Sequence, residues 1–314
     1  MKKPKSIGAA LATAVWDRGV GVAFLVPGLI LLTVILVGPF MTTIGLSFTD
    51  LSYALPDRDG NFVGFDNYRR LMRDDPVFWQ SVITTLQFVA VAVAVEFVLG
   101  FAVALLLSAH IRRRRVVLTL FLVPMMLAPV AVGLIWKLML QGDFGMLTHY
   151  LRTVGLLGEQ TAVFSDPDLA LAAVILIDIW QWTPFVTLVM LAGLLSLPRE
   201  PYEAAIMDGA GRFRIFRDIT VPLLRPVIAL VLLLRGIDAF KEFDKIYILT
   251  GGGPGTATEL LSVYTWRVNF RDWDLGYGAV CAFMVYLVVL ILSAACHTAM
   301  TYARGASGNE GRRG

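Results

Sequence analysis

Residues 198–226, PREPYEAAIMDGAGRFRIFRDITVPLLRP, form a polar segment that separates two long apolar stretches of the chain. Pro201 suits the first turn of a helix, where its missing N–H group costs no hydrogen bond. Gly209 is a residue type that commonly ends a helix, and a second helical pattern with an apolar face follows it. The segment therefore predicts a short helix over 202–208, a turn at Gly209 and a second helix that enters the next apolar stretch.

The apolar stretches around this segment belong to a chain that is hydrophobic along most of its length. Its 314 residues are 57% apolar and 16% charged, whereas soluble domains average about 45–50% apolar and about 25% charged. These values exclude both a soluble globular protein and an intrinsically disordered one. A helix needs about 20 apolar residues to cross a bilayer. Six stretches are long enough: 20–46, 82–109, 116–140, 169–195, 226–244 and 276–302.

The sequence therefore predicts an all-α integral membrane protein with six transmembrane helices. The first apolar stretch is longer than the core of a signal peptide, so we expect it to remain as a helix. Residues 1–80 would hold an N-terminal cytoplasmic tail, the first transmembrane helix and an outer loop. Residues 81–302 would form a five-helix core that includes the inner segment 198–225, and residues 303–314 a second cytoplasmic tail.

The orientation in the membrane follows from the loops in which Lys and Arg are concentrated. One side of the predicted membrane holds both termini, the run Arg112–Arg115 and the segment 198–225, and it carries most of these residues. Cytoplasmic loops carry an excess of positive charge. We therefore expect both termini in the cytoplasm and the long loops at about 49–80, 141–168 and 245–275 outside.

Residues that usually carry catalysis or bind metals are few and scattered. His110, His149 and His297 are far apart, and the two cysteines lie in one apolar stretch, so neither pattern is that of a metal site. The chain has no G-x-x-x-x-G-K-[ST] motif, and Gly-Gly-Gly-Pro at 251–254 lacks the lysine of a phosphate-binding loop. We therefore expect no catalytic residue, metal or cofactor in this chain, and no ATPase activity of its own.

The polar segment also carries a motif. Glu203-Ala204-Ala205 is followed after three residues by Gly209. Nine residues separate Gly209 from Ile219, and two residues separate Ile219 from Pro222. This pattern resembles the EAA motif of bacterial ABC importer permeases, and it lies between the fourth and fifth predicted spans, as in that family.

The resemblance extends along nearly the whole chain to the carbohydrate-importer permeases, the maltose-like branch of type I importers. Further stretches that resemble this branch are FVGFDNY at 62–68, WTPF at 182–185, LAGL at 191–194, DAF at 238–240 and LTGGGP at 249–254. The resemblance implies a type I ABC importer permease core for this chain.

What the resemblance implies about function is a division of labour. In such importers two permease chains form the pathway, and two cytoplasmic ATPases bind ATP and Mg. An external solute-binding protein delivers the substrate. We therefore expect a permease subunit in a bacterial inner membrane, paired with a different but homologous permease. It would move a sugar, oligosaccharide or polyol by alternating access.

The resemblance also assigns a role to the inner segment. The EAA helix of these permeases sits in a cleft of the ATPase and transmits its closure. The residues carried over to this role are Glu203, Ala204, Ala205, Asp208, Gly209 and Ala210. From composition alone, an amphipathic helix resting on the lipid surface remains an alternative for this segment.

Charged residues inside predicted spans are costly and therefore indicate function. Asp178, Trp182 and Phe185 share one helical face, and Asp238 and Glu242 lie one turn apart on another helix. Carboxylates accept hydrogen bonds from sugar hydroxyls, and aromatic rings stack on sugar C–H surfaces. In the carbohydrate branch the transmembrane site draws on these same two helices, so we expect these five residues to line the substrate pathway.

Other interpretations of these charges stay open. Arg235 and Asp238 are three residues apart and could neutralise each other, and Glu96 could pair with another helix or with the partner permease. The substrate could instead be an anionic sugar derivative or glycerol phosphate. A proton-coupled secondary transporter would be expected to show inverted repeats, which the sequence lacks. A membrane-embedded enzyme would need a nucleophile–base pair or a metal cluster.

Overall fold

The computed structural model describes residues 22, 24–109 and 114–310. Regular structure in these residues is helical, apart from two isolated β-bridges. Their elements are η1 (Thr33–Val37), α2 (Gly38–Ser47), α3 (Asp66–Arg73), α4 (Pro76–Ser108), α5 (Arg114–Phe121), α6 (Val123–Met126), α7 (Pro129–Met139), α8 (Met146–Thr153), η2 (Val163–Ser165), α9 (Pro167–Leu195), α10 (Glu200–Met207), α11 (Arg212–Ile215), η3 (Phe216–Thr220), α12 (Val221–Phe240), α13 (Asp244–Leu249), α14 (Leu261–Phe270) and α15 (Leu275–Glu310).

Five helical segments of the described residues are long and apolar enough to cross a membrane. They are Phe24–Ser47, Pro76–Ser108, Pro167–Leu195, Arg212–Leu249 and Leu275–Ala294. These segments coincide with five of the six predicted stretches. The predicted helical, membrane-spanning character is confirmed, and the basic residues at 2–18, 112–113 and 312–313 that indicated the orientation lie outside the described residues.

The remaining stretch, 116–140, does not form the single continuous helix that the sequence analysis expected. It is divided among α5, α6 and α7, and only α7 is counted as a shorter apolar helix. Pro124 and Pro129 explain the division. Proline lacks an N–H group and disfavours helical backbone in the residue before it, and Ala128 is accordingly extended, with ψ at 136°.

Two long helices, α4 and α9, begin with the same local signal. Asp75 precedes Pro76 at the start of α4, and Asp166 precedes Pro167 at the start of α9. The Asp75 carboxylate accepts a hydrogen bond from the Phe78 backbone N–H, and Asp166 accepts from two backbone N–H groups of its own first turn. Aspartate as N-cap and proline in the first turn fix where both helices start.

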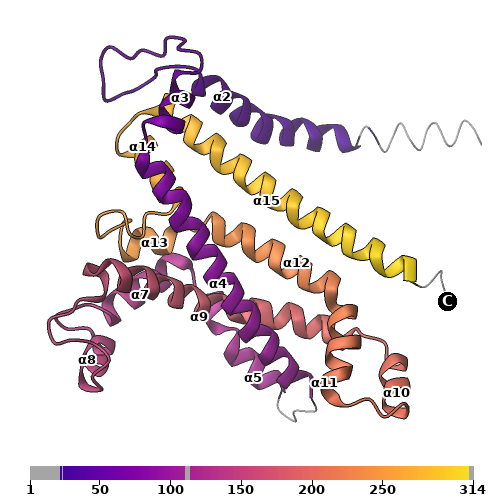
Figure 1. Cartoon of the computed structure of the whole chain (residues 1–314). Helices are drawn as coiled ribbons and strands as arrows, with labels where there is room; N and C mark the ends of the chain where they lie inside the picture. The colour runs from indigo at the N-terminus through magenta and orange to yellow at the C-terminus, as the bar shows by residue number, and fades with distance from the viewer. Residues whose placement is uncertain (1–21, 23, 110–113, 311–314) are drawn as a thin grey trace, which may run out of the picture.

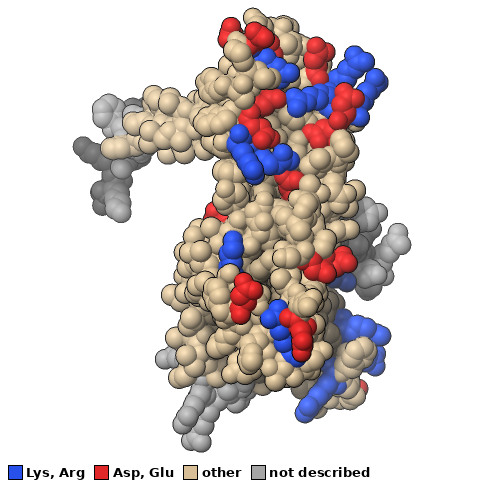
Figure 2. Space-filling view, turned by 90° about the vertical axis from the view of Figure 1, so that its left-hand side faces the viewer, with Lys and Arg blue, Asp and Glu red and all other residues tan. Residues whose placement is uncertain are grey.

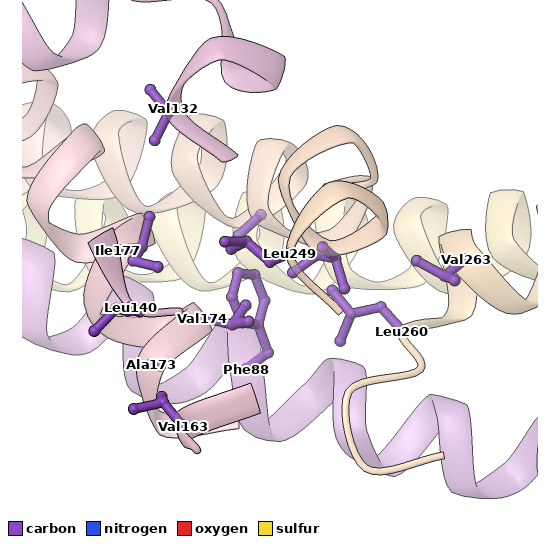
Figure 3. Close-up of a cluster of buried hydrophobic side chains, with 12 residues drawn as sticks. Phe88, Val132, Leu140, Val163, Ala173, Val174, Ile177, Leu249, Leu260 and Val263 are labelled. Carbon is purple, nitrogen blue, oxygen red and sulfur yellow. The ribbon is translucent and has the colours of Figure 1, made fainter. Parts of the chain in front are cut away.

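The core is formed where α4 and α9 pack against α12, α13 and α7. Figure 3 shows one cluster of its buried side chains, which come from α4, α7, η2, α9, α12, α13 and α14 and from loop residues beside them. A glycine brings α4 and α9 close together. A Cβ atom on Gly100 would lie 2.7 Å from the Cβ of Val186, so only glycine lets the two helices approach this closely.

The long helices place two sets of short elements at opposite ends of the molecule, as Figure 1 shows. One end holds α3, α13 and α14 and is called the α14 end below. The other holds α10 and α11 and is called the α10 end. None of the residues in the most apolar part of the helix Phe24–Ser47 is buried. Its second half, α2, contacts α15.

A cluster of polar side chains ties the α14 end together. The Asp75 carboxylate accepts hydrogen bonds from the hydroxyl groups of Tyr264 in α14 and Tyr277 in α15. Arg70 in α3 donates to Asp274 at 2.8 Å, and its guanidinium lies 4.0 Å from the centre of the Tyr277 ring. Figure 2, which shows the left-hand side of Figure 1, has charged side chains of both signs gathered toward its top.

These contacts change the pKa of the Asp75 carboxyl group. Burial alone would raise it, but the hydrogen bonds from Tyr264 and Tyr277 and from backbone N–H groups outweigh burial and lower the pKa below its ordinary value of 3.8. Burial and the hydrogen bond to Asp75 raise the pKa of Tyr264. The carboxylate at this position is therefore ionised at neutral pH and holds α14 and α15 to the start of α4.

Candidate functional site

Five ionisable side chains meet in the interior of the bundle, and they are called the ionic cluster below. Its members are Glu96 of α4, Asp178 of α9, Arg235 of α12, Glu242 after the end of α12, and Lys245 of α13. The Glu242 side chain is 9% exposed and the other four are at most 2% exposed. Charges this deeply buried are tolerated only when they are paired.

The pairing is continuous through the ionic cluster. Arg235 donates from Nε to Glu96 Oε2 at 2.6 Å and from Nη2 to Glu96 Oε1 at 3.1 Å. Its Nη2 also donates to Asp178, which accepts a second hydrogen bond from Lys245 Nζ. Lys245 Nζ in turn lies 3.3 Å from Glu242 Oε2. The cluster thus joins four helices, and it contains three carboxyl groups and two basic groups.

Aromatic rings cover one side of the ionic cluster. The Arg235 guanidinium lies 5.1 Å from the Trp182 ring centre, and Lys245 Nζ lies 5.9 Å from it, within the range of cation–π attraction. Phe185 contacts Trp182 edge to face at 6.3 Å. Among the described residues, the buried atoms without a hydrogen-bond partner include Trp182 Nε1, Arg235 Nη1 and Gln181 Oε1. Hydrogen-bond donors and an acceptor of the described residues therefore remain free beside these rings.

Four of the five expected pathway residues come together here, and one does not. Asp178, Trp182, Phe185 and Glu242 are connected through the ionic cluster and the rings that cover it. Asp238 lies apart. Its side chain is 42% exposed and pairs with Lys241 at 3.0 Å rather than with Arg235.

The structure also supplies partners that sequence reasoning did not identify. Glu96 pairs with Arg235 of the same chain, 139 residues away. Lys245 was not among the candidates because it follows the last predicted turn of the fifth span. The available signal was its position three residues after Glu242, the spacing at which opposite charges pair on a helix.

Residues 198–225, which carry the EAA-like motif and are called the motif segment below, lie at the α10 end. They have the predicted form of helix, turn and helix. α10 covers Glu200–Met207, and Gly209 follows with φ at +72°, a left-handed conformation that glycine adopts without strain. The second helix begins at Arg212 and continues through η3 into α12. The Tyr202 hydroxyl donates to Thr220 Oγ1 at 3.1 Å and fastens α10 to η3.

The tip of this segment exposes apolar side chains. Met207 is 87% exposed, Phe213 is 73% exposed and Ile206 is 64% exposed. Glu203, Ala204, Asp208 and Gly209 are also exposed, and Ala205 and Ala210 are half-buried. Exposed apolar residues grouped at one turn and flanked by charges are typical of a protein contact surface. Small residues beside them allow close backbone approach.

The comparison with protein families decides the classification. Residues 96–298 match the family described as "Binding-protein-dependent transport system inner membrane component". This chain belongs to that family. The match covers both the ionic cluster and the motif segment, and it shows a component of the inner membrane that crosses it several times.

Curated relatives cover nearly the whole chain. The trehalose/maltose transport system permease protein MalF of Thermococcus litoralis is 36% identical over 279 residues, which is 88% of this chain and 91% of that protein. The sulfoquinovosyl glycerol transport system permease protein SmoG of Agrobacterium fabrum is 36% identical over 280 residues, 88% of this chain and 89% of SmoG. The family resemblance found in the sequence is thereby confirmed.

Solved structures confirm the type I ABC importer permease fold. A chain of a bacterial ABC transporter involved in the import of the acidic polysaccharide alginate superposes with a TM-score of 0.80. The match covers 93% of this chain and 99% of that one at 21% identity. A second structure of a bacterial alginate ABC transporter gives a TM-score of 0.75 at 22% identity. At these identities the likeness concerns the fold.

Proposed function

We propose that this chain is the permease subunit of an ATP-driven importer for a sugar, oligosaccharide or polyol that an external binding protein delivers. The observation that carries the proposal is the exposed turn at Gly209 on a chain of the binding-protein-dependent family. A membrane component that lacks a nucleotide-binding motif needs a surface on which a partner ATPase can act. The motif segment offers such a surface, with Met207 and Phe213 exposed.

The proposed topology has six membrane crossings with both termini in the cytoplasm. Five are the long apolar helices, and the remaining one is the interrupted segment from α5 to α7. Irregular backbone is tolerated at membrane depth where it is covered by protein, and α6 and α7 contact α9 and α13. The α10 end is then cytoplasmic. The division into residues 1–80, 81–302 and 303–314 stays a prediction.

The proposed coupling runs from the partner ATPases to the bundle through the motif segment. Glu203, Ala204, Ala205, Asp208, Gly209 and Ala210 would dock into the ATPases. Closure of the ATPase pair on ATP would then pull the motif segments of two homologous permease chains together. Because η3 continues directly into α12, a movement of α10 is transmitted to Arg235 and the ionic cluster. The pathway would open outward on ATP binding and inward after hydrolysis.

The proposed substrate pathway lies along the exposed side of α12 and the rings above the ionic cluster. Asp238 and Glu242 would accept hydrogen bonds from sugar hydroxyls, and Trp182 and Phe185 would offer ring surfaces. Asp178 would act through its two partners, since its oxygens are taken by Arg235 and Lys245. The printed names of two relatives support a carbohydrate-like substrate, namely trehalose or maltose and sulfoquinovosyl glycerol.

An anionic sugar derivative is the second candidate. Lys241 beside the proposed pathway has a side chain that is 66% exposed, and the buried Nη1 of Arg235 has no hydrogen-bond partner in the described residues. Either group could meet an anionic substituent. Competition between neutral and sulfonated sugars for uptake separates the two candidates.

Purification of the tagged chain in mild detergent from its native host tests the proposal. We expect a second multi-span permease and a P-loop ATPase to copurify, and mass spectrometry identifies both. Recovery of this chain alone, under conditions that keep other importers assembled, would contradict the proposal and favour a secondary transporter.

A further inference from the structure

Four aromatic side chains form a continuous row between α12 and α14, called the aromatic ladder below. Phe243 and Tyr247 stack with ring centres 5.3 Å apart and planes inclined by 17°. Tyr247 lies 4.6 Å from Trp266, and Trp266 stacks on Phe270 at 6.2 Å and 28°. The spacing of four residues on α14 places Trp266 and Phe270 on one face. Each ring of the ladder therefore contacts the next, so the four rings form one continuous aromatic surface.

The ladder lies within the α14 end and begins beside the ionic cluster. Its first ring belongs to Phe243, which directly follows Glu242 of the cluster. Ser262 of α14 donates a hydrogen bond to the Glu242 backbone carbonyl, so α14 is fastened beside the cluster. The last ring, Phe270, is 62% exposed, and Tyr247 is 39% exposed. The row therefore runs from an exposed ring to a residue that directly follows the ionic cluster in the sequence.

Charged residues lie close to Phe243 and Tyr247 in the sequence. Lys241 and Asp238 form an ion pair with side chains 66% and 42% exposed, and Asp244 is exposed at the start of α13. These residues belong to a segment long and apolar enough to cross the membrane. Exposed charges in such a segment face water or protein rather than lipid. The segment that carries Phe243 and Tyr247 therefore also presents charged side chains to water or protein.

We propose that the aromatic ladder is a stacking site for the pyranose rings of a sugar on its way from the α14 end to the ionic cluster. The inference rests on the proposed function and adds Phe243, Tyr247, Trp266 and Phe270 to it. Ring faces offer apolar surface to sugar C–H groups, and Asp238, Lys241 and Asp244 offer hydrogen bonds to hydroxyls. Aromatic surfaces with a few placed polar groups are the usual lining of a small-molecule site.

Two other partners could in principle contact the aromatic ladder, namely lipid headgroups and the partner permease. Tyrosine and tryptophan also form belts at the membrane surface, but belt residues meet headgroups and have no need to stack on one another beside an exposed ion pair. A partner permease packed on the ladder would bury Asp238 and Lys241 and would need charges of its own opposite them. Both occupants are outcomes of the following experiment.

Photo-crosslinking on the assembled importer tests the site directly. Trp266 or Tyr247 is replaced by p-benzoyl-phenylalanine in the complete complex with its ATPases and binding protein. Radiolabelled trehalose, maltose and sulfoquinovosyl glycerol serve as probes. Phe144 is the matched control, because it is 70% exposed and makes no ring contact recorded in the described part of the chain. We expect label at positions 266 and 247 during ATP-driven uptake and none at 144.

The outcomes separate the ladder from the proposed function. The stacking proposal would be overturned if a probe were taken up without labelling positions 266 and 247. It would also be overturned if these positions crosslinked to lipid or to the partner permease. Failure of the wild-type complex to accumulate any of the three probes would overturn the proposed sugar substrate, and the ladder with it. The three results are distinguishable in a single set of vesicles.

A second variant series keeps the proposal testable if the photoreactive variants do not assemble. Trp266→Leu keeps an apolar side chain but removes the ring face, and Trp266→Phe restores a ring. We expect uptake of the accumulated probe to fall about three- to tenfold in Trp266→Leu, the range set by the free energy of an aromatic contact, and to recover in Trp266→Phe. Equal uptake in both variants would contradict stacking, and Phe144→Leu should match the wild type.

Discussion

Arg235 of α12 and Glu96 of α4 are 139 residues apart in the sequence, yet Nε of the arginine donates to Oε2 of the glutamate at 2.6 Å. The side chains are 1% and 0% exposed. The pair is bidentate, a geometry that only arginine provides. Because α12 also continues from the motif segment, this contact links the helix that would receive the ATPase movement to the centre of the bundle.

Removal of Arg235 should destabilise the folded bundle strongly. Arg235→Ala leaves Glu96 without its partner and Asp178 with Lys245 alone. Breaking a buried ion pair by removing one side typically costs about 3–5 kcal/mol. We expect a large drop in the thermal unfolding temperature of the purified chain in detergent.

The control for this prediction is Arg225→Ala in the same helix, since Arg225 is exposed. The double variant Glu96→Gln with Arg235→Gln removes both charges and should lose less stability than the sum of the two single variants. If Arg235→Ala unfolds at the same temperature as Arg225→Ala, the ionic cluster does not hold the bundle together.

A methyl group at Gly100 should separate α4 from α9. Gly100→Ala places a Cβ atom 2.7 Å from Val186 Cβ and 3.1 Å from the Thr183 carbonyl oxygen. Overpacking of this kind costs about 1–3 kcal/mol. Gly236→Ala is the matched control, because nothing lies within 4 Å of its added Cβ and alanine favours a helix. Thermal unfolding should show a loss for the first variant only, and equal losses would argue against close packing at Gly100.

The turn at Gly209 should be needed for coupling rather than for insertion into the membrane. Gly209→Val forces a β-branched residue to φ near +72°, which such residues rarely adopt. Gly211→Val is the control, since Gly211 has φ at −70°. We expect the first variant to insert normally but to lose ATP-driven uptake, and the second to retain it. Normal uptake by Gly209→Val would remove the turn from the coupling mechanism.

The hydrogen-bonded carboxylate of Asp75 should make stability depend on pH. Its pKa in the folded chain lies below 3.8, so the unfolded state binds a proton first as the pH falls. The stabilisation is complete at neutral pH and is lost below about pH 4 as the pH passes through the lowered pKa. The unfolding temperature of the wild type should therefore exceed that of Asp75→Asn at pH 7, and the gap should narrow at pH 3. An unchanged gap at pH 3 would contradict this account.

Much of the fold follows from local signals. The pairs Asp75-Pro76 and Asp166-Pro167 mark helix starts, and hydrophobic length marks five of the spans. The break within 116–140 is also local, since it arises from Pro124 and Pro129, but apolar length alone conceals it. A hydropathy pattern records how apolar a segment is, not whether its backbone hydrogen bonds are continuous.

The candidate site was harder to predict from the sequence, because it depends on contacts between distant segments. Helical spacing placed Asp178, Trp182 and Phe185 on one face. It could not show that Arg235 turns toward Glu96 and Asp178 while Asp238 pairs with Lys241. Which of two charges on one helix faces the bundle is decided by the neighbouring helices. Lys245 lies one residue beyond the predicted apolar stretch 226–244, and it enters the cluster from α13, which begins after α12 has ended at Phe240.

The most direct test of the central claim is sugar accumulation by proteoliposomes that contain the complex purified through this chain. The binding protein and a radiolabelled probe such as trehalose, maltose or sulfoquinovosyl glycerol are supplied outside, and ATP is enclosed with the ATPase side. We predict accumulation against a gradient that requires both ATP and the binding protein. Accumulation that proceeds without ATP and collapses when a proton gradient is removed would contradict the account.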